Sequence, residues 1–309
     1  MSERPTTVHR AARILVALTF GLVIAGGLVT SRDAGLAVPD WPTSFGTLNP
    51  PQWYAIENVR TEHGHRLIAG SVALCTLALG LLVLRREKRT AVRRLAIAAM
   101  GVVLLQALLG GLRVLELSVD LAMVHACVGQ IFFTIVVCLA AITSPHWQTD
   151  PRRTAVSNID AGRTANMLAA FVVAQLLIGI VLRHAGAAAR PLLGNLIFYV
   201  HAMVAFAIYA TAVRLHDLLN DCGNHLRDRS RLLVRLILAQ LALGVLTFAL
   251  TEAMTYQRQA TLLESWVPTF HVAIGAAILG LVATLVLHTR RTAGDETETL
   301  EAQTAPPIR

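Results

Sequence analysis

The sequence predicts an all-α integral membrane protein with eight transmembrane helices, arranged as two tandem, parallel-repeat four-helix bundles. Of its 309 residues, 55% are hydrophobic and only 15% are charged, whereas a soluble domain carries about 25% charged residues. The apolar residues fall in blocks of roughly 20, the length that a helix needs to cross a hydrocarbon core of about 30 Å. Because backbone groups in lipid must bond internally, and the blocks are too long for barrel strands, each block is expected to be a helix.

The first apolar block raises the question of a signal peptide. It follows a basic stretch, Arg10–Arg13, but its apolar run is too long and no clear small-residue cleavage site comes after it, so we expect a retained helix. The expected helices span residues 12–30, 66–84, 94–115, 121–143, 165–183, 193–213, 232–251 and 267–288.

The basic residues are distributed as in a membrane protein. A net charge of +8 and a pI near 10.1 would also suit a nucleic-acid binder. However, most of the 27 lysines and arginines lie in the N-terminal segment, in alternate loops and in the C-terminal segment. This positive-inside pattern predicts that both termini are cytoplasmic. We therefore expect a multi-pass protein of the inner (cytoplasmic) membrane that contacts lipid and does not bind nucleic acid.

An internal repeat divides the expected helices into two halves. The segment Gln106-Ala-Leu-Leu-Gly110 recurs as Gln240-Leu-Ala-Leu-Gly244, and the end of the first helix, from Gly27, resembles the end of the fifth, from Gly179. Because each half contains four helices and so begins and ends on one side, the repeats are parallel. The expected parts are an N-terminal half at 12–145, a cytoplasmic linker at 146–164, a C-terminal half at 165–290 and a disordered cytoplasmic tail at 291–309.

Four histidines at matched places carry the functional prediction. His65 and His201 open the second and sixth expected helices, and His125 and His271 open the fourth and eighth. Two imidazoles that face each other across a helix bundle can ligate a haem iron axially, so each half is expected to hold one haem. The alternative for any single histidine is a structural hydrogen bond. Zinc would need a further ligand, which the second half does not offer near its two histidines.

The first half differs from the second by a carboxylate close to its first histidine. Glu62 lies three residues before His65, where it could accept protons or stabilise a developing cation. Alternatively, Glu62 caps the helix or pairs with Arg66. Arg66 is itself a candidate haem-propionate contact, or else an interfacial arginine. His63 is the competitor of His65 as a ligand.

The remaining polar residues receive simpler interpretations. Arg113 and Arg183 are further candidate propionate contacts that could equally snorkel to the interface. His184 is a less favoured ligand, and Gln106 and Gln240 are expected to bond between helices. The histidines expected to be solvated on the cytoplasmic side are His9, His146, His216, His225 and His288. The cysteines, for which no disulfide is expected, are Cys75, Cys127, Cys138 and Cys222.

The sequence resembles the haem A synthases over about residues 12–288. Three motifs carry the resemblance, and a histidine at the start of the fourth helix follows them. The motifs are the stretch Gly26–Pro42, the segment Glu62-x-x-His65-Arg66 and the segment Gly110-Gly111-Leu-x-Val. The second half matches mainly through its histidines and its helix plan.

The resemblance implies an oxidoreductase that converts a methyl group of haem O to a formyl group, through a hydroxylated intermediate, to give the haem A of terminal oxidases. It implies that His65 and His125 hold the substrate haem O, that His201 and His271 hold a haem b cofactor, and that Glu62 assists the chemistry. The partners implied are haem O synthase, terminal oxidase assembly and an electron acceptor that the sequence does not identify. The haem sites are expected toward the outer face.

One departure and two alternatives accompany this resemblance. Many bacterial members carry a cysteine pair in the first outer loop, and this sequence has none between Asp33 and Arg60. The aromatic residues of that loop either cover the substrate site or anchor the loop at the interface. A cytochrome b-like di-haem carrier that exchanges electrons with quinone is the alternative function, and a non-enzymatic haem transporter is the third.

Overall fold

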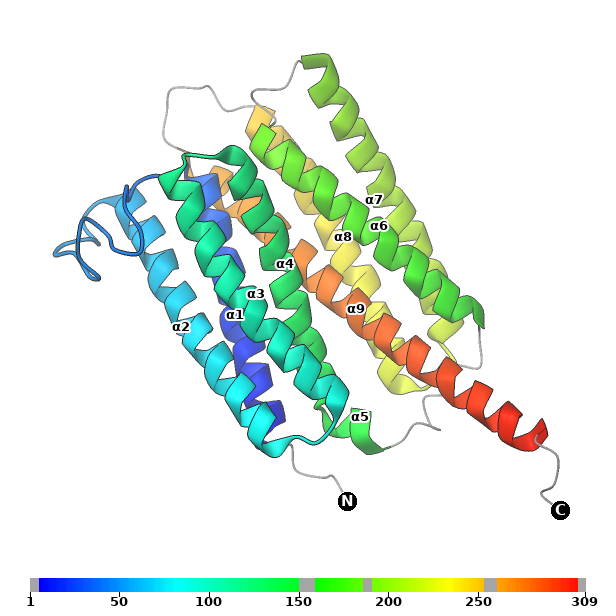
Figure 1. Cartoon of the computed structure of the whole chain (residues 1–309). Helices are drawn as coiled ribbons and strands as arrows, with labels where there is room; N and C mark the ends of the chain where they lie inside the picture. Colours follow the sequence, from blue (N-terminus) through cyan, green and yellow to red (C-terminus); the bar gives the residue numbers. More distant parts are fainter. Residues whose placement is uncertain (1–5, 150–158, 186–190, 253–259, 305–309) are drawn as a thin grey trace.

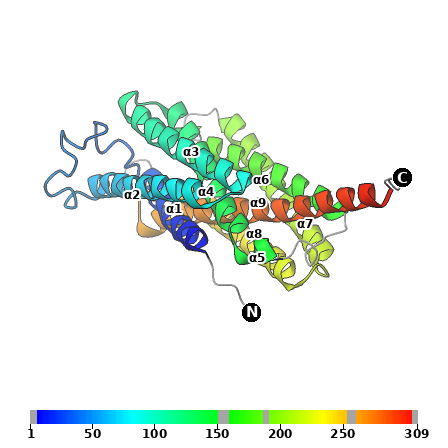
Figure 2. The same cartoon turned by 60° about the horizontal axis from the view of Figure 1, so that its bottom comes forward.

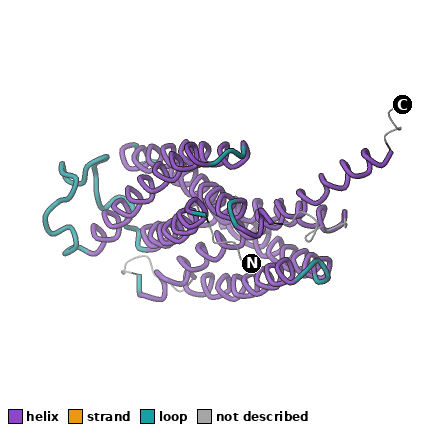
Figure 3. Tube along the Cα trace, turned by 90° about the horizontal axis from the view of Figure 1, so that it is seen from below, coloured by secondary structure: helices purple, strands orange, loops and turns teal. Residues whose placement is uncertain are grey.

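The computed structural model describes residues 6–149, 159–185, 191–252 and 260–304, and nearly all of these residues are helical (Figure 3). An isolated bridge between Ser44 and Thr47 is the β-type pairing found in these ranges. The helices are α1 (Thr7–Ser31), α2 (Glu57–Arg86), α3 (Thr90–Leu115), α4 (Val119–Ile142), α5 (Pro145–Thr149), α6 (Ile159–Ala185), α7 (Pro191–Leu219), α8 (Asn224–Glu252) and α9 (Leu262–Thr304).

Eight of these helices are long and apolar enough to cross a membrane, which confirms the predicted fold class. Only 11 to 44% of the residues in their most apolar windows are buried inside the protein. Large apolar side chains therefore point outward, among them Leu74 at 70%, Phe206 at 66% and Val245 at 73% exposure. In water such a surface would be unfavourable, whereas in lipid it is the expected outer face. The chain is a multi-pass membrane protein.

Several helices extend beyond their predicted ends, because hydropathy does not register polar residues that continue a helix. α2 begins at Glu57 rather than at 66, and α6 begins at Ile159, inside the predicted linker 146–164. The linker also contains the short helix α5, while residues 150–158 lie outside the described part. α9 runs to Thr304, beyond the predicted end of the last helix at 288. Residues 305–309 are not among those described.

The helices form two bundles side by side, α1 to α4 and α6 to α9 (Figures 1 and 2). Within each bundle every helix contacts its neighbours in sequence, and the first helix also contacts the last. The bundles meet through α1, α4, α6 and α9. α1 starts and α9 ends at the same end of the molecule, and the loop of residues 32–56 lies at the opposite end (Figure 1). This arrangement is consistent with two tandem halves of parallel direction.

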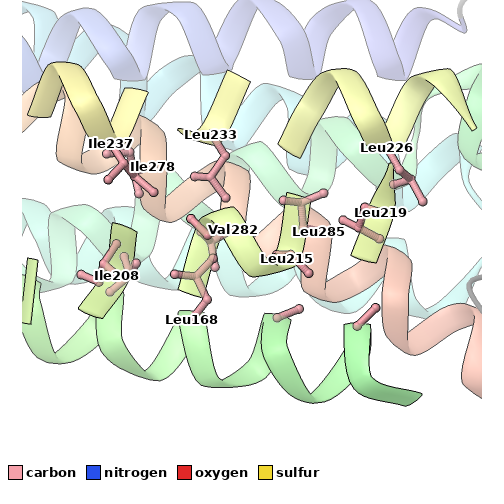
Figure 4. Close-up of a cluster of buried hydrophobic side chains, with 14 residues drawn as sticks. Leu168, Ile208, Leu215, Leu219, Leu226, Leu233, Ile237, Ile278, Val282 and Leu285 are labelled. Carbon is pink, nitrogen blue, oxygen red and sulfur yellow. The ribbon is translucent and has the colours of Figure 1, made fainter. Parts of the chain in front are cut away.

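Each bundle has its own apolar core. In the second bundle, leucine, isoleucine and valine side chains from α6, α7, α8 and α9 interdigitate around Leu215, Leu233 and Leu285, each at 0% exposure (Figure 4). The first bundle has an equivalent cluster that includes Leu15 and Val72. Burying a leucine side chain contributes about 1.5–3 kcal/mol. These cores lie nearer the end of the molecule that carries both α1's start and α9's end, which leaves the other end for polar residues.

Candidate functional site

Each of the four predicted histidines lies against a glycine of the neighbouring helix. A Cβ atom built on Gly26 of α1 would lie 3.2 Å from Cε1 of His65 on α2, and one on Gly110 of α3 would lie 3.1 Å from Cε1 of His125 on α4. The absence of side chains at these glycines therefore gives each imidazole room to lie on the adjacent helix.

The second half repeats this arrangement. A Cβ on Gly179 of α6 would lie 3.1 Å from Cε1 of His201 on α7, and one on Gly244 of α8 would lie 3.2 Å from Cε1 of His271 on α9. By this geometry Gly26, not Gly27, is the partner of Gly179, so the sequence comparison of the two helix ends was displaced by one residue.

Three glutamines stand four residues before three of these glycines. The side-chain amide of Gln106 donates to the carbonyl oxygen of His125 at 2.9 Å, as the sequence predicts. Gln175, which sequence reasoning missed, donates in the same way to the carbonyl of His201 at 2.9 Å. Nε2 of Gln240 lies 3.3 Å from Nε2 of His271. The Gln-x-x-x-Gly spacing, which is visible at Gln106 and Gln240, recurs at Gln175 and would have predicted its bond.

The histidines are brought together in two groups, one in each half. His65 lies close enough to His125 to interact electrostatically with it, and also with Arg113 and Arg66. His271 interacts likewise with His201 and Arg183. Nδ1 of each of the four histidines is buried without a hydrogen-bond partner among the described residues. Nε2 is the ring nitrogen left to bind a metal in His65, His125 and His201, whereas Nε2 of His271 faces the side-chain amide of Gln240.

Glu62 is buried, at 3% exposure, and both of its carboxylate oxygens are bonded. Oε1 accepts a hydrogen bond of 2.7 Å from Arg66, one turn later on α2. Oε2 accepts one of 2.9 Å from the backbone N–H of Val38. The predicted alternative, a pair between Glu62 and Arg66, is therefore present, and it holds the loop as well.

The guanidinium of Arg66 is hydrogen-bonded mainly to the loop of residues 32–56. Its nitrogens donate to the carbonyl oxygens of Asp40 at 2.6 Å, Thr43 at 3.0 Å and Val38 at 3.1 Å. The planar fork of arginine allows several such bonds at once. Two residues before His65, buried His63 places Nδ1 2.8 Å from Oγ of Ser44. The Nδ1 side of the His63 ring therefore faces the loop.

The loop also reaches α3, next to the glycine that faces His125. The ring of Trp41 lies where a Cβ on Gly111 would be, and Arg113 donates to the carbonyl oxygen of Gly35 at 2.8 Å. Trp53 packs against the ring of His63 with centroids 5.0 Å apart, while Tyr54 is 60% exposed. The two tryptophans thus pack against α3 and α2, and Tyr54 faces outward.

Arg183 bonds across the two halves. Its guanidinium donates to the carbonyl oxygen of Gly27 at 3.0 Å and to Oγ of Ser31 at 2.8 Å. Ser31 also lies 3.0 Å from the hydroxyl of Thr269 on α9. Nδ1 of His184 lies 3.0 Å from the carbonyl oxygen of Ile180 in its own helix.

The histidines expected to be solvated are mostly packed instead. His9 is buried, with Nδ1 3.0 Å from the carbonyl of Ala140, and Nδ1 of His216 lies 2.8 Å from Oγ of Ser230. The ring of His225 lies 5.3 Å from that of exposed His146 and 5.5 Å from that of buried His288. Only His146 meets the expectation. His288 is covered by Trp147 of α5, while His9 and His216 contact residues of α4 and α8.

The residues present suit haem better than a metal ion held by protein alone. Within the described ranges, no three His, Cys, Asp or Glu side chains are grouped as metal ligands, whereas each half offers two imidazoles, as a six-coordinate haem iron requires. The four cysteines are free.

The comparisons with known proteins concern the first half. Residues 2–137 match the family described as cytochrome oxidase assembly protein. The heme A synthase of Brucella anthropi is 32% identical over 158 residues, which are 48% of this chain and 43% of the relative. That of Azorhizobium caulinodans is 35% identical over 150 residues, 45% of this chain and 41% of the relative. The matched region thus spans less than half the length of these relatives. Residues 2–137 are thus similar to the family described as cytochrome oxidase assembly protein, and a region of about this size is similar to part of the heme A synthases.

Proposed function

We propose that this protein is a haem A synthase, an oxidoreductase that converts a methyl group of haem O to a formyl group through a hydroxylated intermediate. One observation carries the proposal: His65 and His125 are grouped beneath a loop that is bonded to the buried carboxylate of Glu62. The second half has two histidines in equivalent places, but no carboxylate corresponds to Glu62 there, since Phe198 stands three residues before His201. The relatives named heme A synthase support the same function.

The four histidines divide between substrate and cofactor. His65 and His125 would ligate the substrate haem O, and His201 and His271 would ligate haem b. When bound, the haem groups supply redox-active iron for the oxidation and for electron transfer. The glycines behind the imidazoles set how deeply each ring lies in the bundle, because a side chain there would displace it. Arg113 and Arg183 lie near the histidine groups, and their remaining N–H donors are the proposed propionate contacts.

Glu62 is the proposed catalytic residue. Conversion of the methyl to the formyl group takes an oxygen atom from water, passes four electrons to the electron acceptor and releases four protons, which a carboxylate close to the haem edge can accept in turn. To take up a proton, Glu62 must exchange one of its two present bonds, to Arg66 or to the N–H of Val38. Arg66 keeps a bond to the carboxylate in place while its other donors hold the loop over the site.

The proposed location is the inner (cytoplasmic) membrane, with both termini cytoplasmic and the haem sites toward the outer face. The distribution of lysine and arginine supports this orientation. The proposed partners are haem O synthase as the source of substrate, terminal oxidase assembly as the destination of haem A, and an electron acceptor.

The experiment is haem extraction and mass analysis from cells that make haem O, with and without the protein. Wild type is expected to yield haem A or its hydroxylated precursor, and Glu62→Gln to lose most of that product while retaining haem. Glu57→Gln is the matched control, since Glu57 lies on the same helix but its side chain is 52% exposed. Haem O that persists unchanged with folded, haem-loaded wild type would contradict the proposal.

The second candidate is a di-haem electron carrier that exchanges electrons with quinone. The bonds of both Glu62 oxygens favour it, because they give the carboxylate a structural role that needs no catalysis. Reduction of both haems by quinol, without any change in haem O, would select this function.

A further inference from the structure

The four histidines are not held alike, although their glycine contacts are the same. On three of the helices that carry the glycines, a glutamine four residues earlier bonds to the histidine of the next helix: Gln106, Gln175 and Gln240. On α1 the equivalent position is Leu22, four residues before Gly26. Leu22 packs against the apolar core of the first half. The carbonyl oxygen of His65 therefore receives no side-chain donor among the described residues.

A glutamine of this kind ties two helices together at the ligand. Where Gln106 and Gln175 donate to the carbonyl of the histidine residue, the ligand's backbone is fixed to the helix behind it. Such a bond contributes about 0.5–1.5 kcal/mol, and breaking it inside the bundle leaves polar groups without partners. His125 and His201 are restrained in this way, whereas the amide of Gln240 lies 3.3 Å from the ring Nε2 of His271, and no such glutamine stands behind His65.

The turn of α2 that carries His65 is tied to the loop instead. Glu62 accepts from the N–H of Val38, and His63 is bonded to Ser44. Arg66 donates to the carbonyls of Val38, Asp40 and Thr43. Residues before and after His65 are thus bonded to the segment Val38–Ser44, so displacement of this segment releases the restraints on His65 and leaves His125 held by α3.

We infer that His65 is the exchangeable axial ligand of the first half, and that the segment Val38–Ser44 controls its release. Release of His65 from a bound haem would be the dissociation of a neutral ligand, with no oxidation and no proton transfer, and His65 would bind again when the next haem is taken up. His125 keeps the haem oriented meanwhile. The inference rests on the proposed function, because a substrate haem has to be taken up and its product released, whereas a cofactor haem stays bound.

The test uses the purified full chain loaded with haem b and haem O. The reduced protein is mixed with carbon monoxide, which binds ferrous haem only where an axial ligand has left. In parallel, apomyoglobin in excess captures released haem, which is identified by mass. In wild type, haem O is expected to leave faster than haem b. Leu22→Gln, which supplies the missing donor, is expected to slow both carbon monoxide binding and haem O release by roughly three- to tenfold. Leu22→Met is the matched control and leaves both rates unchanged.

A second variant keeps the test decisive if Leu22→Gln folds poorly. Arg66→Lys loosens the loop without touching Leu22, and it is expected to accelerate haem O release while haem b release stays the same. Haem O rates that are insensitive to both variants would overturn the inference and leave the proposed function standing. A chain that retains haem b but takes up no haem O at all would instead contradict the proposed function.

Discussion

Arg66 donates a hydrogen bond of 2.7 Å to the carboxylate of Glu62, and both side chains bond to the backbone of Val38, Arg66 to its carbonyl oxygen and Glu62 to its N–H. The ion pair therefore links one turn of α2 to Val38 in the loop that follows α1. An ion pair on an exposed helix surface contributes little, but this one is buried and lies within a network, where each bond depends on the others.

Replacement of Arg66 by lysine tests this network. A lysine ammonium keeps the charge but cannot reproduce the planar fork that reaches three loop carbonyls. Arg66→Lys is therefore expected to speed amide hydrogen exchange in residues 38–47 by about tenfold or more. Arg60→Lys is the control, because Arg60 donates only to the carbonyl of Tyr54 at the exposed rim. Equal exchange in the two variants would show that the loop does not depend on Arg66.

Each glycine behind a histidine is expected to control one haem site alone. In Gly244→Val the added side chain overlaps the place of the His271 ring, so haem bound at the second half is expected to be lost while the first half retains its haem. Gly110→Val is the reciprocal change. Gly101→Val is the control, since nothing lies within 4 Å of a Cβ at that position. Haem content and low-spin absorbance check the outcome, and loss of both haems in either variant would speak against two separate sites.

Gly111 is expected to be intolerant of even one added carbon. A methyl group there overlaps the ring of Trp41, which must then leave α3. Overpacking of this kind costs about 1–3 kcal/mol, so Gly111→Ala should lower the thermal unfolding midpoint in detergent. Gly101→Ala has open space and should leave the midpoint unchanged or raise it slightly. A Gly111→Ala variant as stable as Gly101→Ala would mean that Trp41 does not pack there in solution.

The turn that begins at Asp40 is expected to persist into strong acid. Hydrogen bonds from the Thr43 hydroxyl and from the Gly46 and Phe45 N–H groups lower the pKa of Asp40 from 3.8 to about 2. Because the folded pKa is depressed, this contribution to stability is fully present above pH 3.8 and is lost as the pH falls to about 2. The protection factors of the Phe45 and Gly46 amides, which correct for the intrinsic pH dependence of exchange, should fall through that window in wild type. Asp40→Asn should show no such fall, and a midpoint near pH 4 in wild type would contradict the assignment.

Arg183 is expected to couple the two halves. Without its bonds to Gly27 and Ser31, the contact between α6 and α1 loses its polar link. Arg183→Leu should therefore lower the unfolding midpoint, whereas Arg163→Leu, whose side chain is 75% exposed, should not. A second, earlier unfolding transition in Arg183→Leu would locate the weakness at the contact between the halves.

Hydropathy predicts the eight helices well because their lipid-facing length is set by the membrane rather than by packing. It does not predict the first turns of α2, where Glu57 to His65 are polar yet helical. The histidines are recognisable from the repeat, but the loop bonds of Arg66 and Arg113 run to backbone carbonyls distant in sequence, which no side-chain pattern reveals. The role of Gln175 could have been predicted from the sequence, because its spacing to Gly179 repeats that of Gln106 to Gly110. The burial of His288 could not be predicted from the sequence, because it depends on the position of α5.

The contacts between the bundles are reciprocal: α1 contacts α9 as α6 contacts α4, and α4 contacts α9. These are the contacts of an isologous pair, in which the same surface of two subunits serves both partners. A single four-helix half thus contains every surface needed to associate with a copy of itself. The contacts of the two bundles are therefore those expected of a twofold homodimer, although here both bundles belong to one chain and Glu62 has an equivalent in neither the sequence nor the contacts of the second.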